Sequence, residues 1–448
     1  MGYLTRPPEQ AGLPAGIPWI IGNEAAERFS FYGMRTILVV FMTTHLMDAA
    51  GRPAPMDEAE AKGWYHLFVS AVYLTPLLGA ALADLWLGKY RTILLLSLVY
   101  CAGHLVLALD ATRAGLAVGL ALIALGAGGI KPCVSAHVGD QFGWRNRRLI
   151  PRTFAWFYAA INLGAFSSTL LTPWLLDRFG PHWAFGVPGL LMALATWIFW
   201  AGRRRFVHVP PAGGALLNEL LSRDTGRIFL RLGVIYLFVA VFWALFDQIG
   251  SSWVLQARHM DRVVMGVEIL PAQVQAANPL LVLLLIPLFQ RWLYPWLERR
   301  GFARPMHKVA LGFFVAVAAF AVAAVAQARI DAGGAPSILW QLAAYLLLTA
   351  AEVMVSITAL EYAYTQAPRT MKSFVMALFM LSVSLGNLFT GAVNFFIQRS
   401  DGGLLLEGAA YFWFFTGLML ATALLFTALL PRIRDRLILQ SDAAAKTA

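Results

Sequence analysis

The chain has 448 residues, of which 59% are hydrophobic and only 13% charged, and its net charge is +11. Soluble globular proteins carry about 25% charged residues, so this composition excludes an ordinary soluble enzyme and predicts a protein that crosses a membrane repeatedly. Cys101 and Cys133 form neither a disulfide framework nor a C-x-x-C metal or redox site. The polar, proline-rich N-terminus and the long, charged run after it predict no cleavable signal.

A membrane-spanning helix needs roughly 20 mainly apolar residues, and the apolar runs predict about twelve such helices. In chain order they lie near residues 17–47, 64–86, 92–110, 114–140, 152–176, 182–201, 228–257, 270–296, 306–328, 337–366, 372–398 and 409–430. The expected fold class is therefore an all-α polytopic membrane protein.

The longest polar stretch, Arg203–Arg227, separates two sets of six runs. This predicts an N-terminal six-helix bundle (1–202), a cytoplasmic linker (203–227), a C-terminal six-helix bundle (228–436) and a cytoplasmic tail (437–448). Two six-helix halves around a central site describe the major facilitator fold, in which substrate binds near the membrane midplane.

Lys and Arg are concentrated in alternate connecting segments, with 24 on the side of the N-terminus and 8 on the other side. By the positive-inside rule this bias predicts that both termini are cytoplasmic. The excess of Lys and Arg is therefore explained by the orientation of the chain in the lipid membrane, and a nucleic-acid partner is not expected.

Several charged residues lie inside the predicted spans, where each costs about 2.5–3.5 kcal/mol at the bilayer centre. They are Glu24, Glu27, Arg28, Arg35, Lys131, Asp247, Glu352 and Glu361. So many charges are tolerated when they pair or face a wet cavity, which predicts a solute pathway. Snorkelling near a helix end is the alternative, and it stays open above all for Glu361.

The first predicted span places charges in one stripe. Glu24, Arg28, Phe31 and Arg35 are spaced by four, three and four residues, so they share one helix face, with Tyr32 beside it. Glu24 and Glu27 compete for Arg28, and the less neutralised carboxylate is expected to exchange protons. Lys131 can supply the missing charge or bind an anionic substrate group.

The run Glu24-x-x-Glu27-Arg28-Phe29-x-Phe31-Tyr32-Gly33 resembles the signature of the proton-dependent oligopeptide transporter family. Further runs, over nearly the whole chain, are similar to the family's motifs: residues 79–91, 128–135, 157–164, 242–248, 278–279 and 352–356. Tyr65-His66 ahead of Tyr73-Leu-Thr-Pro76, and Asp247, are similar in particular to the animal intestinal and renal peptide transporters.

The resemblance implies a proton-coupled symporter that imports di- and tripeptides by alternating access, with protons as coupling ion, no cofactor and no enzyme activity. It assigns Arg35 and Lys131 to the peptide carboxylate. Glu352 is suited to the ammonium, because charge-assisted bonds are strong. The remaining predicted substrate residues are Tyr32, Tyr73, Asn162, Asn278, Ser356 and Phe379. For the aromatic ones, and for Phe31, ordinary helix packing is the alternative.

Proton coupling is assigned to Glu24, Glu27 and Arg28 together with His66 and Asp247. Imidazole titrates near neutral pH, and in the animal proteins such a histidine works with an acid of the seventh helix at the outer gate. A neutral packing role for His66 is the alternative.

Asp84, Gly88 and Arg91 resemble the cytoplasmic gate motif of facilitators and are expected to form a structural latch. His45, His104 and His137 receive no role.

Some features depart from the family pattern. Animal members carry a large extracellular domain between helices 9 and 10, where this chain has a turn around Asp331–Pro336. Many bacterial members carry two extra central helices, for which the linker is too short. A minimal importer of the bacterial inner membrane fits both absences. Phe379 stands where the family usually has tryptophan.

Two alternatives stay open. One is a carrier of the same family that moves another small anion or an amino acid conjugate. The other is a membrane-embedded enzyme, against which stands the absence of His-Glu-x-x-His and Gly-x-Ser-x-Gly motifs.

Overall fold

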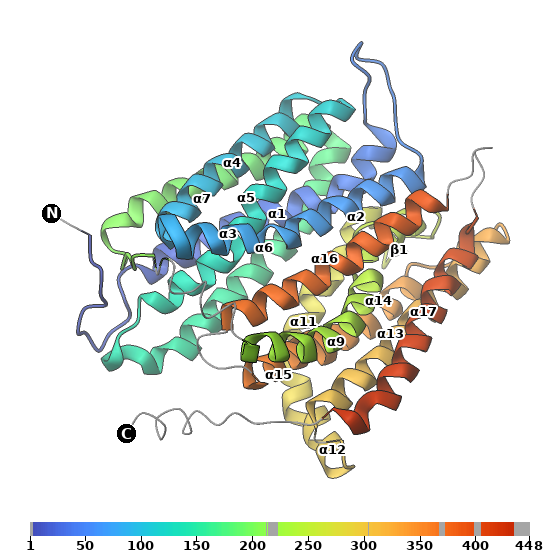
Figure 1. The fold of residues 1–448 in the computed structure, drawn as a ribbon. Helices are drawn as coiled ribbons and strands as arrows, with labels where there is room; N and C mark the ends of the chain where they lie inside the picture. The colour runs from blue at the N-terminus through green and yellow to red at the C-terminus, as the bar shows by residue number, and fades with distance from the viewer. Residues whose placement is uncertain are drawn as a thin grey trace. The chain divides into compact units, whose positions relative to one another are not determined.

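The computed structural model describes residues 3–211, 213, 223–302, 304–366, 372–397 and 405–433, and most of them are helical (Figure 1). The chain forms two compact units. Unit 1 comprises Met1–Asn218, Gly250–Leu255 and Ile269–Pro279, and unit 2 comprises Glu219–Ile249, Gln256–Glu268 and Leu280–Ala448. The predicted domain boundaries stay a prediction. The predicted tail and residues 212 and 214–222 of the predicted linker lie outside the described residues.

Unit 1 is a bundle of helices whose long members lie side by side, from blue to green in Figure 1. Helix α1 packs against α6 and α7, α4 packs against α5 and α7, and α2 packs against α5. The elements are α1 (Ile17–Thr44), α2 (Glu58–Leu74), α3 (Pro76–Ala81), η1 (Leu82–Leu87), α4 (Lys89–Leu109), α5 (Arg113–Asp140), η2 (Trp144–Leu149), α6 (Ile150–Phe179), α7 (Pro181–Ala201) and η3 (Gly202–Arg204). η5 (Pro271–Ala276) also belongs to this unit.

Side-chain caps set the starts of two helices in unit 1, and these starts lie before the predicted apolar runs. Helix α2 begins at Glu58 and not near residue 64, because the Asp57 side chain accepts a hydrogen bond from the Glu60 backbone N–H. The side chain of Thr112 caps α5 in the same way. Apolar runs mark the part of a helix that suits lipid, and polar caps extend the helix beyond it.

Unit 2 contains the remaining elements, and α13 packs in it against α14 and α17, while α16 packs against α9. They are α9 (Arg223–Phe246), η4 (Asp247–Gly250), α10 (Ser252–Ala257), β1 (Val263–Val264), β2 (Val267–Glu268), α11 (Ala277–Leu288), η6 (Phe289–Leu293), α12 (Tyr294–Arg299), α13 (Pro305–Asp331), α14 (Leu339–Glu352), η7 (Val353–Ile357), α15 (Thr358–Gln366), α16 (Lys372–Phe396), α17 (Gly408–Leu429) and η9 (Leu430–Arg432). Of these elements, the last residue of η4, most of α10 (252–255) and the first turn of α11 (277–279) belong to unit 1.

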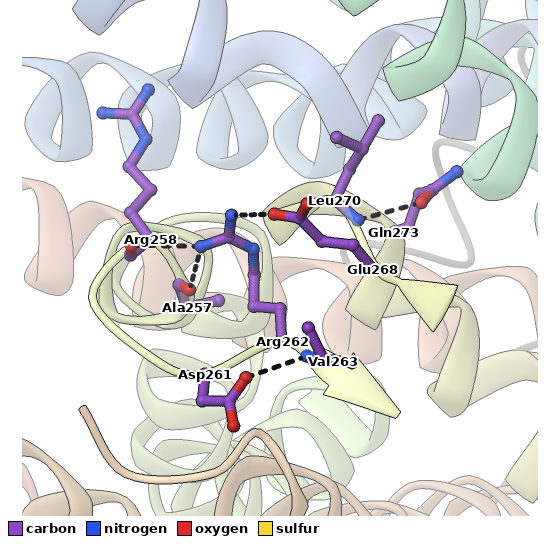
Figure 2. A network of polar contacts seen from close by, with 8 residues as sticks. All are labelled: Ala257, Arg258, Asp261, Arg262, Val263, Glu268, Leu270 and Gln273. Carbon is purple, nitrogen blue, oxygen red and sulfur yellow. Dashed lines mark hydrogen bonds and ion pairs between the residues drawn. The ribbon is translucent and has the colours of Figure 1, made fainter. Parts of the chain in front are cut away.

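A short hairpin follows α10 (Figure 2). Strands β1 and β2 are antiparallel, and the turn between them holds Met265 and Gly266 at positive φ. Arg262 Nη1 donates to the carbonyl of Ala257, the last residue of α10, at 3.3 Å and to that of the next residue, Arg258, at 3.1 Å. Its Nη2 donates to Glu268 at 2.8 Å. One guanidinium therefore caps α10 and holds the far strand of the hairpin.

Eleven helical stretches in the described residues are long and apolar enough to cross a membrane. Helix α1 is 28 residues long but is not one of the eleven, because it carries Glu24, Glu27, Arg28 and Arg35. With α1 the described helices match the prediction of about twelve spans.

Candidate functional site

Helix α1 carries the predicted charged stripe in the core of unit 1. Glu24, Arg28, Phe31 and Arg35 are 3%, 6%, 1% and 8% exposed. Gly164 of α6 allows this helix to pack closely, because a Cβ there would lie 2.7 Å from the Ala25 carbonyl oxygen. Close helix contact through small residues is common inside membranes, and it explains the glycine two residues after Asn162.

Arg28 holds both acids of the signature. Its Nε lies 2.8 Å from Glu24 Oε1 and 2.6 Å from Glu27 Oε2. The single hydrogen on Nε is donated to Glu24, and neither oxygen of the buried Glu27 accepts a hydrogen bond within the described chain. Glu24 is thus hydrogen-bonded to Arg28, and Glu27 is only ion-paired with it. The sequence could not tell which of the two acids Arg28 binds by a hydrogen bond.

Lys131 lies among aromatic rings. Its Nζ is 4.5 Å from the centroid of the Phe31 ring and 4.1 Å from that of Tyr73. Cation–π contacts of this kind stabilise a partly desolvated ammonium without neutralising its charge.

The glycines before Lys131 explain how Tyr73 reaches it. A Cβ on Gly128 would lie 1.8 Å from Thr75 Oγ1, and one on Gly79 would lie 2.1 Å from the Gly129 carbonyl oxygen. Thr75 Oγ1 also donates to the Ala124 carbonyl at 2.7 Å. The missing side chains of Gly128 in α5 and Gly79 in α3 therefore allow α5 to contact the junction of α2 and α3.

Arg35, a predicted carboxylate ligand, is positioned by α2. Its Nε donates to the hydroxyl of Tyr65 at 2.7 Å, and Tyr65 is fully buried. A Cβ on Gly250 would lie 1.9 Å from that hydroxyl, so only glycine fits there without displacing Tyr65. The segment Gly250–Leu255, distant in sequence, thus packs on the residue that orients Arg35.

His66 is fully buried, and its Nε2 lies 2.8 Å from Ser251 Oγ. Asp247, the predicted partner of His66, belongs to unit 2, where Asn387 Nδ2 donates to its Oδ2 at 2.6 Å. The predicted His66–Asp247 pair joins two units and stays a prediction. Sequence reasoning missed Ser251 and Asn387, because neither lies in a motif beside its partner.

The predicted amides and the tyrosine of the signature also belong to unit 1. Asn162 is 6% exposed, and its Nδ2 donates to the Tyr158 carbonyl of its own helix at 2.9 Å. Asn278 lies in the first turn of α11. The Tyr32 ring meets Phe31 edge-on, with centroids 5.5 Å apart.

In unit 2, Glu352 ends α14 and is followed at once by the π-helical turn η7, which contains Ser356. Such turns are rare and are frequent at functional sites. Phe379 packs edge-on against Tyr236 and Trp243, each at a centroid distance of 6.0 Å. Phe379 thus sits in an aromatic cluster, and its place in a pocket wall stays a prediction.

Asp84 lies in another π-helical turn, η1, and Gly88 directly after it has a φ of 75°. The Asp84 carbonyl accepts a hydrogen bond from Gly213 at 3.2 Å. Lys89 Nζ and Asp140 Oδ2, 2.7 Å apart, form the ion pair of this region, while Arg91 is exposed. The sequence motif pointed to this region but missed the pair that ties α4 to the end of α5.

No group of three or more His, Cys, Asp or Glu side chains in the described residues could hold a metal ion. Charged residues of the predicted site instead form acid–base pairs and cation–π contacts, and such an arrangement has the chemistry to bind ionic solutes or to exchange protons.

The sequence profile of the POT family matches residues 90–225 and 221–414. The chain belongs to the POT family. Peptide transporter family 1 of Drosophila melanogaster is 40% identical over 369 residues, which are 71% of this chain and 48% of that protein. Solute carrier family 15 member 1 of Homo sapiens is 37% identical over 381 residues, 71% of this chain and 53% of its own length. The chain spans about half the length of the curated relatives it matches.

Solved structures of POT family members match over almost their full length. PepTSo is 36% identical with a TM-score of 0.86, and covers 94% of this chain and 98% of its own. An auto-inhibited POT family peptide transporter is 38% identical with a TM-score of 0.87, covering 95% and 99%. These matches confirm the predicted fold class, an all-α polytopic membrane protein of the major facilitator type. The POT relatives are transporters and not enzymes.

Proposed function

We propose that this POT family member is a proton-coupled symporter that imports di- and tripeptides by alternating access. One observation carries the proposal. A single helix, α1, holds a buried acid–base cluster of Glu24, Glu27 and Arg28 beside Arg35, with Lys131 next to its Phe31. Proton exchange and anion binding are thereby linked through one rigid element.

A peptide presents a carboxylate at one end and an ammonium at the other, with variable side chains between. Arg35 and Lys131 bind the carboxylate, and Glu352 binds the ammonium with help from Asn162 and Asn278. Tyr32, Tyr73, Ser356 and Phe379 contact the middle of the peptide. Gripping the ends serves many sequences, because the charged termini are the groups that all peptides share.

The coupling step uses Glu27, Lys131 and the incoming carboxylate. Without a proton, Glu27 is an anion that holds part of the charge of Arg28 and Lys131. Protonation of Glu27 breaks no hydrogen bond, since the carboxylate accepts none in the described chain. Lys131 is then available to the peptide carboxylate, so proton and peptide bind together. His66 and Asp247 act as a second proton site at the outer gate.

Asp84, Gly88 and Arg91, reinforced by Lys89 and Asp140, act as the latch at the opposite end. The N-terminal segment supports the predicted topology. Leu4 pairs with Val207 in a parallel bridge, and six predicted spans separate the two residues. An even number of spans returns the chain to the same side, as this bridge requires, and the bias of Lys and Arg assigns that side to the cytoplasm of a bacterial inner membrane.

The test is uptake of labelled di-alanine into proteoliposomes with and without an inward proton gradient. We expect accumulation above the equilibrium level only with the gradient, and competition by unlabelled di- and tripeptides. No accumulation, together with no competition by peptides against any accepted solute, would remove the peptide assignment. Accumulation of another small anion or amino acid conjugate would select the alternative carrier.

A further inference from the structure

We propose that unit 1 carries a binding site for an anionic phospholipid where α1 and α6 begin, in addition to the peptide site. The site consists of an apolar hollow and a neighbouring group of arginines. The hollow has a volume of about 460 Å³ and is lined by Leu13, Ile17, Pro18, Ile21, Gly22 and Trp156. This volume falls within the range of about 300–1,000 Å³ that ligand pockets occupy.

The lining of the hollow selects the chemistry of its occupant. None of its six residues carries a charge, and the single polar side-chain atom among them is the Trp156 indole nitrogen. A peptide needs polar partners for both of its termini, because unpaired charged groups lose hydration when they are buried. A hydrocarbon chain needs none and gains free energy with each CH₂ that leaves water. The hollow therefore suits an acyl chain.

The rim of the hollow adds positive charge. Trp156 lines the hollow, and the Arg152 guanidinium lies over its ring, 4.8 Å from the centroid. Arg147 and Arg148 come just before α6, where Arg147 lies 3.5 Å from the centroid of the Trp144 ring. Among the described residues none of these three exposed arginines pairs with a carboxylate, whereas nearby Arg145 lies 3.4 Å from Glu9.

The two halves of the site match the two ends of a phospholipid. Cytoplasmic leaflets are rich in anionic headgroups, and basic pockets between spanning helices on that side bind them. In unit 1, Arg152 lies over Trp156 of the apolar hollow, and Arg147 and Arg148 lie in the turn just before α6, at the end predicted to be cytoplasmic. A phospholipid fits both halves of the site when its phosphate binds Arg152 and Arg148 and one acyl chain lies against Ile21 and Trp156.

The molecule also contains a matched control. Arg300 lies over the Trp296 ring in unit 2, with the guanidinium carbon 5.3 Å from the centroid. It has the same residue pair and an exposed charge but does not belong to the hollow. If any arginine–tryptophan pair attracted lipid, substituting Arg152 or Arg300 would reduce lipid retention equally. If the hollow is a specific site, only substitution of Arg152 reduces it.

The experiment is native mass spectrometry of the purified chain, reconstituted with phosphatidylglycerol or phosphatidylcholine of identical acyl chains. We expect one retained phosphatidylglycerol in preference to phosphatidylcholine, about fivefold weaker for Arg152→Gln and again for Arg148→Gln. Arg300→Gln should leave retention unchanged. Ile21→Trp, which fills the hollow, should abolish it. Leu13→Trp, at the exposed rim and outside α1, repeats this test in case Ile21→Trp does not fold.

Equal retention of the two lipids, an equal loss in Arg300→Gln, or full retention in both tryptophan variants would overturn the proposal. Displacement of the lipid by di-alanine would also overturn it, because the hollow would then belong to the peptide pathway. The readout is lipid binding and not uptake, since Ile21 lies one turn before Glu24 and its substitution also affects the coupling helix. The lipid-binding result can therefore be interpreted even if the protein does not transport peptides.

Discussion

Two helical stretches that carry predicted site residues are built differently. In unit 1, α1 is regular throughout and is tied to three neighbours: Asn23 to the Ala195 carbonyl, Ser30 to His104, and Thr172 to the Gly33 carbonyl, at 2.8, 2.8 and 2.9 Å. In unit 2, the stretch that carries Glu352 changes at once into the π-helical turn η7.

The difference concerns how each stretch can respond to a ligand. Hydrogen bonds on several sides hold the charges of α1 in place, so we expect Glu27 to gain or lose its proton, and Arg28 to change partners, without a change of helix. A π-helical turn contains a local expansion of the helix, and such turns mark places where a helix adjusts. We infer that α1 is the fixed part of the site and that the Glu352 stretch is the adjustable part.

A first expectation concerns the proposed carboxylate ligands, Arg35 on α1 and Lys131 of α5 beside Phe31 of α1. Lys131→Ala or Arg35→Ala should lower uptake of di-alanine by about 10- to 150-fold, the loss of a charged hydrogen bond worth about 1.5–3 kcal/mol. Proteoliposome uptake measures this. Esterifying the peptide C-terminus should weaken binding to the parent protein much more than to either variant. An unchanged ester penalty in both variants would mean that the carboxylate binds elsewhere.

A second expectation separates coupling from binding. Glu24→Gln and Glu27→Gln mimic the protonated acids and should abolish gradient-driven uptake, while peptide exchange without a gradient persists. Glu352→Gln should reduce both activities, because it weakens the ammonium site itself. Parallel uptake and counterflow assays measure the two activities. Equal losses in both assays for all three variants would contradict the division between the two stretches.

A third expectation concerns the outer gate. His66→Ala and Asp247→Ala should each lose gradient-driven uptake, and the double variant should be scarcely worse than either single one, because coupled groups act as a pair. Ser251→Ala is the matched control, since it removes only the hydrogen bond to His66. Near-additive losses would indicate independent roles. Normal uptake in His66→Ala would make His66 a packing residue and leave Glu24 and Glu27 as the proton site.

The smallest effects are on stability and test the comparison directly. A Cβ on Gly164 meets the Ala25 carbonyl oxygen of α1, whereas one on Gly312 meets the Val355 side chain of η7, each at 2.7 Å. Gly164→Ala should destabilise the protein by about 1–3 kcal/mol, because backbone cannot move aside. Gly312→Ala should cost less, since a side chain and a π-helical turn can shift.

Gly417 supplies the control, because a Cβ there meets nothing within 4 Å, and Gly417→Ala should be neutral or stabilise by up to about 1 kcal/mol. Thermal unfolding in detergent measures all three variants. A larger loss for Gly312→Ala than for Gly164→Ala would reverse the assignment of fixed and adjustable parts.

Several features of the structure could be predicted from local sequence patterns. Helix count followed from apolar runs, because lipid requires long apolar helices. The stripe of Glu24, Arg28 and Arg35 followed from helical spacing, and the structure places the three on one buried helix. Helix ends were less predictable: the start of α2 depends on a cap at Asp57, seven residues before residue 64, where the apolar run was predicted to begin.

The partners of the site residues were beyond such patterns. Ser251 and Asn387 lie 185 and 140 residues from His66 and Asp247, and no periodicity relates them. The π-helical turns that contain Asp84 and follow Glu352 could not be predicted from residue spacing. A π-helical turn has one extra residue, and its residue types are those of an ordinary helix.

By itself the sequence determined the number of spans, the class of membrane protein and which charges share a helix face, because all three depend on residues close together in the chain. The tertiary structure alone decided which acid Arg28 hydrogen-bonds, that Tyr65 holds Arg35 against Gly250, and that Lys131 lies between two aromatic rings. The contacts of Arg35 and Lys131 form where Gly250, Gly128 and Gly79 leave room for close packing. The geometry of that packing depends on the packed unit as a whole and on no single segment.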